Sequence, residues 1–135
     1  MENSTVSEKI LYSTIRIECF KTNGQKSTGS GYFFAFKRTE QNYVPVIITN
    51  KHVIKNTNTG KLTFTKKNTD GNPIDNKKVD IIINDFEKRW TLHPDPNVDL
   101  CFMPFADALT FLKQEGEEVF FIPLETSLIP NAEQI

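Results

Sequence analysis

The segment from Tyr43 to Thr49, Tyr-Val-Pro-Val-Ile-Ile-Thr, constrains the fold of this chain more than any other. A short apolar, β-branched run of this kind is typical of a buried strand. A polar turn follows at once, and His52 stands where the strand ends. We therefore expect the strand to fix the position of this histidine while the turn leaves one face of its imidazole open. Because histidine changes its charge near neutral pH, such a placement suits a general base.

Other short segments also have the composition or the two-residue alternation of strands, and turn residues separate them. In Ser13–Phe20, for example, Ile15, Ile17 and Cys19 share one face, which indicates a half-buried strand. The glycines before Phe33 permit a bulge or a close backbone approach. The remaining predicted strands are 27–36, 61–67, 78–84, 89–92, 98–103 and 118–124.

One segment has a helical period instead. From Phe105 to Gln114, apolar residues stand at positions 105, 108, 109 and 112, and Gly116 is a suitable helix end. Many short strands with hairpin-like spacing and a single short helix favour a mainly β barrel or sandwich. The alternative is an α+β domain whose helix packs on one face of a sheet.

Length and charge exclude several classes of protein. The chain has 135 residues, enough for one domain with its own core. Its 16 basic and 17 acidic residues give a net charge of -1, which argues against a dedicated nucleic-acid or polybasic membrane surface. No apolar run approaches the ~20 residues that a membrane span needs. The N-terminus shows no signal-peptide pattern, so we expect a cytoplasmic location by default.

The two cysteines, Cys19 and Cys101, lie in apolar, strand-like runs. A disulfide between them is possible, but two buried free thiols fit these surroundings better. Cys101 follows Asp99 by two residues and, as a thiol in an apolar run, is expected to be core rather than a nucleophile.

Asp99 stands at a second polar-to-apolar junction. A proline-rich corner containing His93 leads to Asp99, and Leu-Cys-Phe-Met follows it. This apolar run is expected to draw the carboxylate toward a dry environment, where it needs a partner. An imidazole N–H is a suitable partner, and a carboxylate behind a histidine fixes its tautomer and stabilises the imidazolium. The segments around His52 and Asp99 therefore indicate a base and its orienting acid.

Three motifs in order carry a resemblance to a family. Gly29-Ser-Gly-Tyr-Phe-Phe34, Ile48-Thr-Asn-Lys-His-Val-Ile54 and Asn97-Val-Asp-Leu-Cys-Phe102 resemble the trypsin-like serine peptidases in order and spacing, most closely the bacterial, non-zymogen branch. The resemblance implies that His52 is the general base and Asp99 its partner. It also implies that residues 13–124 form an antiparallel six-stranded Greek-key β-barrel, the first of two, after an N-terminal extension over 1–12.

The chain departs from this family in its nucleophile. The family order is His, Asp, Ser, with the serine in a Gly-Asn-Ser-Gly-like turn of the second barrel, and no such turn follows Asp99. Ser30 precedes the histidine at the family's early-strand glycine position, and Ser127 lies near the expected join, so neither is expected to attack. Residues 125–135 would begin the inter-barrel linker, and the second barrel would be absent.

The resemblance therefore implies the N-terminal half of a serine endopeptidase. The full-length protein would hydrolyse polypeptide substrates, whereas this chain would be inactive alone. Its inter-barrel face, left exposed, would favour self-association.

Two other functions are open. A non-catalytic β-barrel would serve as a protein-binding module. A metal site would use His52, His93, Asp95 and Asp99, whose side chains suit zinc, but their spacing matches no tight motif, and residues 95–99 lack the glycine and glutamate of a calcium loop. We therefore expect no cofactor and no metal, and expect His93 to shape the path of the loop that leads to Asp99.

Overall fold

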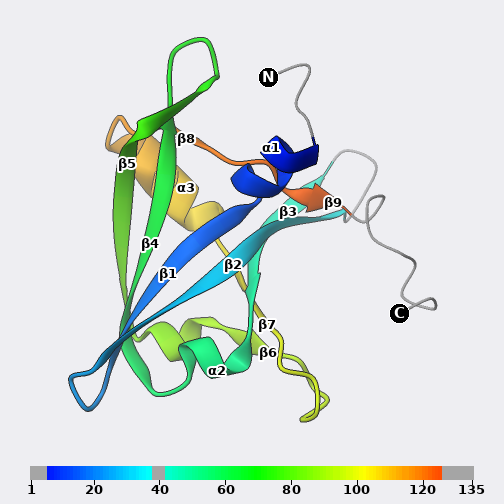
Figure 1. The fold of residues 1–135 in the computed structure, drawn as a ribbon, viewed down its shortest axis with the longest axis vertical. Helices are drawn as coiled ribbons and strands as arrows, with labels where there is room; N and C mark the ends of the chain where they lie inside the picture. Colours follow the sequence, from blue (N-terminus) through cyan, green and yellow to red (C-terminus); the bar gives the residue numbers. More distant parts are fainter. Residues whose placement is uncertain (1–5, 38–41, 126–135) are drawn as a thin grey trace.

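Nine strands join in one sheet in a computed structural model that describes residues 6–37 and 42–125 (Figure 1). In chain order they are β1 (Thr14–Lys21), β2 (Lys26–Lys37), β3 (Tyr43–Thr49), β4 (Thr57–Lys67), β5 (Pro73–Asn84), β6 (Thr91–Leu92), β7 (Cys101–Pro104), β8 (Val119–Phe120) and β9 (Leu124–Glu125). The strand order is β5-β4-β1-β2-β3-β7-β6, with β8 beside β4 and β9 beside β2. Every pairing except β2 with β9 is antiparallel. The predicted mainly β, antiparallel fold is confirmed.

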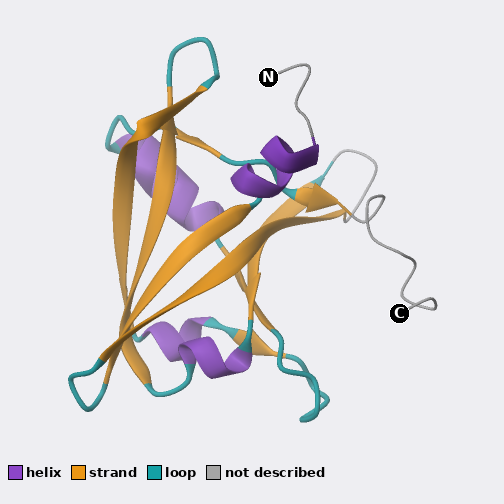
Figure 2. Ribbon diagram, viewed as in Figure 1, coloured by secondary structure: helices purple, strands orange, loops and turns teal. Residues whose placement is uncertain are grey.

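Helices are few and short beside the strands (Figure 2). They are α1 (Val6–Tyr12), α2 (Lys51–Ile54), the 3-10 turn η1 (Phe86–Arg89) and α3 (Ala106–Gln114). The prediction of a single helix was therefore wrong, although α3 lies where it was expected. Helices of four and seven residues are too short to show the apolar period by which a helix is recognised in a sequence. None of the helices in the described ranges is long and apolar enough to cross a membrane.

The strand boundaries differ from the prediction where the sequence is polar. The strand at Tyr43–Thr49 has the predicted limits, but β4 and β5 begin several residues earlier than their apolar patterns do. Pairing with neighbouring strands holds these early residues. Thr57 of β4 pairs with Lys21 of β1, and Pro73 of β5 pairs with Lys67 at the end of β4. The single strand expected at 118–124 is instead two short pieces, β8 and β9, on different partners. Of the predicted linker at 125–135, only Glu125 is among the described residues.

Aromatic rings form the centre of the hydrophobic core. The ring of Phe33 on β2 lies 6.0 Å from that of Phe64 on β4, 5.3 Å from that of Phe105 and 4.9 Å from that of Phe121. Aliphatic residues from β1, β3 and β4 complete this core, namely Ile15, Ile17, Ile47 and Leu62. Phe33 and Phe64 lie on strands of the sheet, whereas Phe105 and Phe121 lie before and after α3. This cluster therefore joins the sheet to the segment around α3.

The sheet does not close on itself. The strand β5 lies at one end of the order and β6 at the other. A cleft of about 560 Å³ lies between the second half of β5 and the start of α3, lined by Ile81, Ile83, Met103, Phe105 and Ala108 among others. The closed six-stranded barrel therefore stays a prediction.

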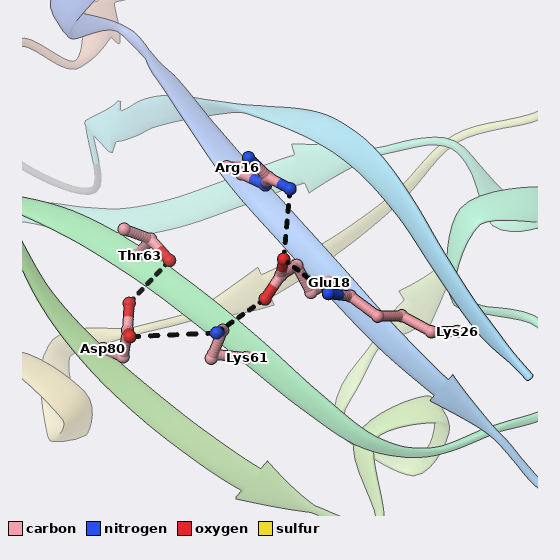
Figure 3. Close-up of polar contacts among 6 residues, drawn as sticks. All are labelled: Arg16, Glu18, Lys26, Lys61, Thr63 and Asp80. Carbon is pink, nitrogen blue, oxygen red and sulfur yellow. Dashed lines mark hydrogen bonds and ion pairs between the residues drawn. The ribbon is translucent and has the colours of Figure 1, made fainter. Parts of the chain in front are cut away.

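A buried carboxylate is the centre of a cluster of charged residues on the outward face of the sheet. Glu18 on β1 is only 7% exposed and forms ion pairs with Arg16 (3.1 Å), Lys26 (3.2 Å) and Lys61 (2.7 Å) (Figure 3). Nζ of Lys61 in turn lies 3.9 Å from Oδ2 of Asp80 on β5. The hydrogen bonds from Lys61 and Lys26 lower the pKa of Glu18 to about 2. The cluster thus links β2, β1, β4 and β5 through charge.

Because Glu18 has a lower pKa in the folded chain than the ~4.3 of an unfolded glutamate, it should make stability depend on pH. Its contribution is full above the unfolded value and is lost as the pH falls toward about 2. We expect the difference in free energy of unfolding between the parent chain and Glu18→Gln to be largest above pH 5 and to shrink steadily in acid. Urea unfolding between pH 7 and pH 2.5 measures it. The same change at Glu115, exposed at the end of α3, is the control; a Glu18→Gln difference that does not vary with pH would contradict the prediction.

Candidate functional site

The pairing of β3 with β7 brings α2 and the segment before β7 to one end of the sheet (Figure 1). The last pair of this ladder joins Thr49 to Cys101. His52 lies in α2, which begins two residues after β3 ends, and Asp99 lies two residues before β7 begins. Two segments far apart in the sequence thus meet because their strands are neighbours.

The Asp99 carboxylate binds His52 twice. Its Oδ2 lies 2.5 Å from Nδ1 of the imidazole, and its Oδ1 accepts the main-chain N–H of the same residue at 3.1 Å. Because an ionised carboxylate only accepts hydrogen bonds, Nδ1 carries the proton. The other ring nitrogen, Nε2, is then an acceptor, and nothing in the described part of the chain is hydrogen-bonded to it. The predicted residues are therefore brought together in the arrangement of a general base and its orienting acid.

This pair is open to solvent. The side chain of His52 is 73% exposed and that of Asp99 is 49% exposed, so the expected dry environment for the carboxylate was wrong. The alternation that buries Cys101 and Met103 begins with β7 and does not extend back to Asp99, which lies in the preceding loop. The hydrogen bond from His52 nevertheless holds the pKa of Asp99 below its ordinary value.

The glycine-bearing motif supports α2 from beneath. A Cβ at Gly29 would lie 2.8 Å from a methyl group of Val53, so only glycine lets α2 lie this close to β2. The Thr49 hydroxyl donates to the main-chain carbonyl of Ser30 at 2.8 Å. Ser30 itself is inside β2, and between its hydroxyl and His52, both within the described ranges, there is no hydrogen bond. Ser127 lies outside the described residues.

The loop before Asp99 is a set of turns. The His93 main-chain N–H donates to the Leu100 carbonyl at 2.9 Å, and its Nδ1 accepts the main-chain N–H of Asp95 at 3.0 Å. The Asp95 carbonyl accepts the main-chain N–H of Val98 at 3.0 Å. His93 therefore shapes the loop that leads to Asp99. Within the described ranges, no three His, Cys, Asp or Glu side chains gather as a possible metal site.

Two further residues of this site were missed in the sequence. The Asn50 side-chain amide donates to the main-chain carbonyl of Asp99 at 2.8 Å, and Lys51 Nζ donates to that of Asp95 at 3.1 Å. Their only signal was their place in the polar turn before His52. The carbonyl that each side chain binds is set by how the loop before Asp99 packs against α2, which the sequence around Asn50 and Lys51 does not show.

Both thiols are free and buried, as expected. Cys19 donates to the Val53 carbonyl and Cys101 to the Thr49 carbonyl. Burial raises the pKa of Cys101 to about 11, so the thiolate that a nucleophile needs is disfavoured there. Cys101 is therefore a core residue.

Two clefts adjoin the pair. One of about 390 Å³ lies beside the imidazole and is lined by Lys51, His52, Ile54, Lys55, Glu87, Leu92 and Asp99. The other, of about 340 Å³, is apolar and lies on the outward face of β3 and β7, lined chiefly by Phe36, Ile48, Leu92, Leu100 and Phe102.

Comparisons of the chain with known family models, curated proteins and solved structures find no match. The indications of its function are the motifs and the geometry of the His52–Asp99 pair.

Proposed function

We propose that this chain is the first β-barrel of a trypsin-like serine endopeptidase of the bacterial, non-zymogen type. In this proposal His52 and Asp99 are the base and the acid of a His-Asp-Ser triad, and the serine comes from sequence outside these 135 residues. The full-length protein hydrolyses peptide bonds in polypeptide substrates, and the chain alone, which lacks the nucleophile, does not.

The double contact between Asp99 and His52 carries the proposal. Because Oδ2 holds the proton of Nδ1 and Oδ1 holds the main-chain N–H, the imidazole is fixed in the tautomer that leaves Nε2 as the acceptor. Nε2 then takes the serine proton as the serine oxygen attacks the substrate carbonyl. The imidazolium, stabilised by the Asp99 carboxylate, returns that proton to the leaving amine.

The strand order supports the barrel. The four strands β4-β1-β2-β3 have the spatial order of a Greek key, in which the fourth strand returns beside the first. Beyond them, β5 lies next to β4 and β7 next to β3. Pairing of β5 with β7 across the intervening cleft would make a closed ring of six strands.

An apolar face beside the pair supports a second barrel. On the outward face of β2, β3 and β7, Phe36 is partly exposed and its ring lies 6.2 Å from that of Phe102. Leu92 and Leu100, both exposed, flank the apolar cleft on this face. Exposed apolar surface of this kind marks interaction sites. We assign it to the second barrel, and to self-association of the 135-residue chain in its absence.

Reaction with a fluorophosphonate tests the proposal. We expect a longer product of the same reading frame to be labelled on a serine beyond residue 135, and the change His52→Ala to abolish labelling because the serine loses its base. Phe111→Ala, at an exposed position on α3 and away from α2, should leave labelling intact. Absence of a reactive serine, or labelling that survives His52→Ala, would sink the proposal. The first outcome would instead favour a protein-binding module, which the exposed apolar face also fits.

A further inference from the structure

Asn50 occupies the N-cap position of α2, but its side chain does not cap that helix. An N-cap asparagine ordinarily accepts a hydrogen bond from the main-chain N–H two or three residues later. In α2 the first of these donors belongs to His52 and is bound by Asp99 Oδ1, and the second, Val53, donates to the Asn50 main-chain carbonyl at 3.0 Å. The beginning of α2 is therefore satisfied without the Asn50 side chain.

The Asn50 amide is used on the opposite loop instead. Its Nδ2 donates to the main-chain carbonyl of Asp99 at 2.8 Å. Asp99 is outside β7, so strand pairing does not fix this peptide directly. The hydrogen bond from Asn50 thus holds the main chain of Asp99, and the carboxylate of Asp99 is the group that accepts two N–H groups of His52.

We propose that Asn50 is a positioning residue for the His52–Asp99 pair. By holding the main-chain carbonyl of Asp99, it sets the carboxylate so that both oxygens meet N–H groups of His52. The catalytic use of the pair rests on the proposed function, whereas the positioning of Asp99 by Asn50 is a property of the 135-residue chain and can be tested on it.

Lys51 provides a matched comparison. Its Nζ also donates to a main-chain carbonyl of the same loop, at Asp95. That carbonyl already accepts the Val98 N–H, so the turn there is closed without the lysine. If loosening of the loop in general disturbed the pair, loss of either side chain would do so; if the Asp99 peptide matters, only loss of Asn50 should.

The 135-residue chain is sufficient for the test. Carbon-13 NMR follows the titration of the Asp99 carboxyl, and proton NMR follows the Nδ1 proton of His52. In Asn50→Leu we expect the Asp99 pKa to rise toward the ~3.9 of an ordinary aspartate, and the Nδ1 proton signal to be lost through faster exchange. In Lys51→Leu the Nδ1 proton signal should match that of the parent chain, and the Asp99 pKa should stay below its ordinary value because the bond from His52 is kept.

Asn50→Ser separates positioning from capping. Serine is as good an N-cap as asparagine, but its hydroxyl is too short to replace the amide at the Asp99 carbonyl, so it should behave like Asn50→Leu. It also decides the question if Asn50→Leu does not fold. Parent-like titration and proton signals in Asn50→Ser would overturn the inference. If the spectra change in Asn50→Ser but the longer protein has no reactive serine, the proposed function fails and the role of Asn50 stands. If the spectra of Asn50→Ser match the parent chain and the longer protein is labelled, the role of Asn50 fails and the proposed function stands.

Discussion

Replacing Phe33 with alanine is expected to lower the free energy of unfolding by about 3–5 kcal/mol. Phe33 is only 3% exposed and stands at the centre of the aromatic cluster, with ring contacts to Phe64, Phe105 and Phe121. These partners come from β4 and from both sides of α3, so they cannot all move into the space that a lost ring leaves. Cavity formation therefore adds to the loss of apolar burial, and the change removes a large part of a typical domain stability of about 5–15 kcal/mol.

Urea unfolding at neutral pH, followed by tryptophan fluorescence from Trp90, measures this loss. The matched control is Phe111→Ala on α3, where the side chain is 51% exposed and the expected change is within about 0.5 kcal/mol. Equal losses at the two positions would mean that the cluster around Phe33 is not the core of the folded chain.

The sequence predicted the fold best where burial on the sheet is strongest. The strand at Tyr43–Thr49 had its limits right because an apolar run ends there in a polar turn. The mostly polar first residues of β4 and β5 could not be assigned to strands, since cross-strand pairing rather than an apolar pattern in the sequence holds them. The helix α1 was missed for the related reason that seven residues give too little periodicity.

In the site, too, the parts attached to buried strands could be predicted and the loop contacts could not. His52 and Asp99 could be paired from their motifs, because each motif is attached to a strand and the two strands are neighbours. The exposure of Asp99 could not be predicted, because alternation was extended past the true start of β7. The contact of Asn50 depends on a loop 49 residues away, and no local pattern contains that information.

The change Asp99→Asn should have the largest effect on the proposed reaction. In the full-length protein we expect kcat for peptide hydrolysis near pH 7 to fall by about 10⁴-fold, the loss found when the orienting acid of such a triad becomes an amide. An asparagine has one accepting oxygen in place of two. If this oxygen accepts the His52 main-chain N–H, the amide NH₂ faces Nδ1 and favours the tautomer with its proton on Nε2. The nitrogen that must take the serine proton is then already protonated.

Asp95→Asn is the control within the same loop. The Asp95 side chain accepts the main-chain N–H of Asn97 at 2.9 Å, and an asparagine oxygen accepts that bond equally well. We therefore expect kcat within about twofold of the parent enzyme. Steady-state kinetics on a peptide substrate, with circular dichroism to verify folding, compare the two variants. If Asp99→Asn kept kcat within tenfold of the parent enzyme, Asp99 would not be the residue that fixes the His52 tautomer, and its two bonds to His52 would serve only to hold α2 against the loop.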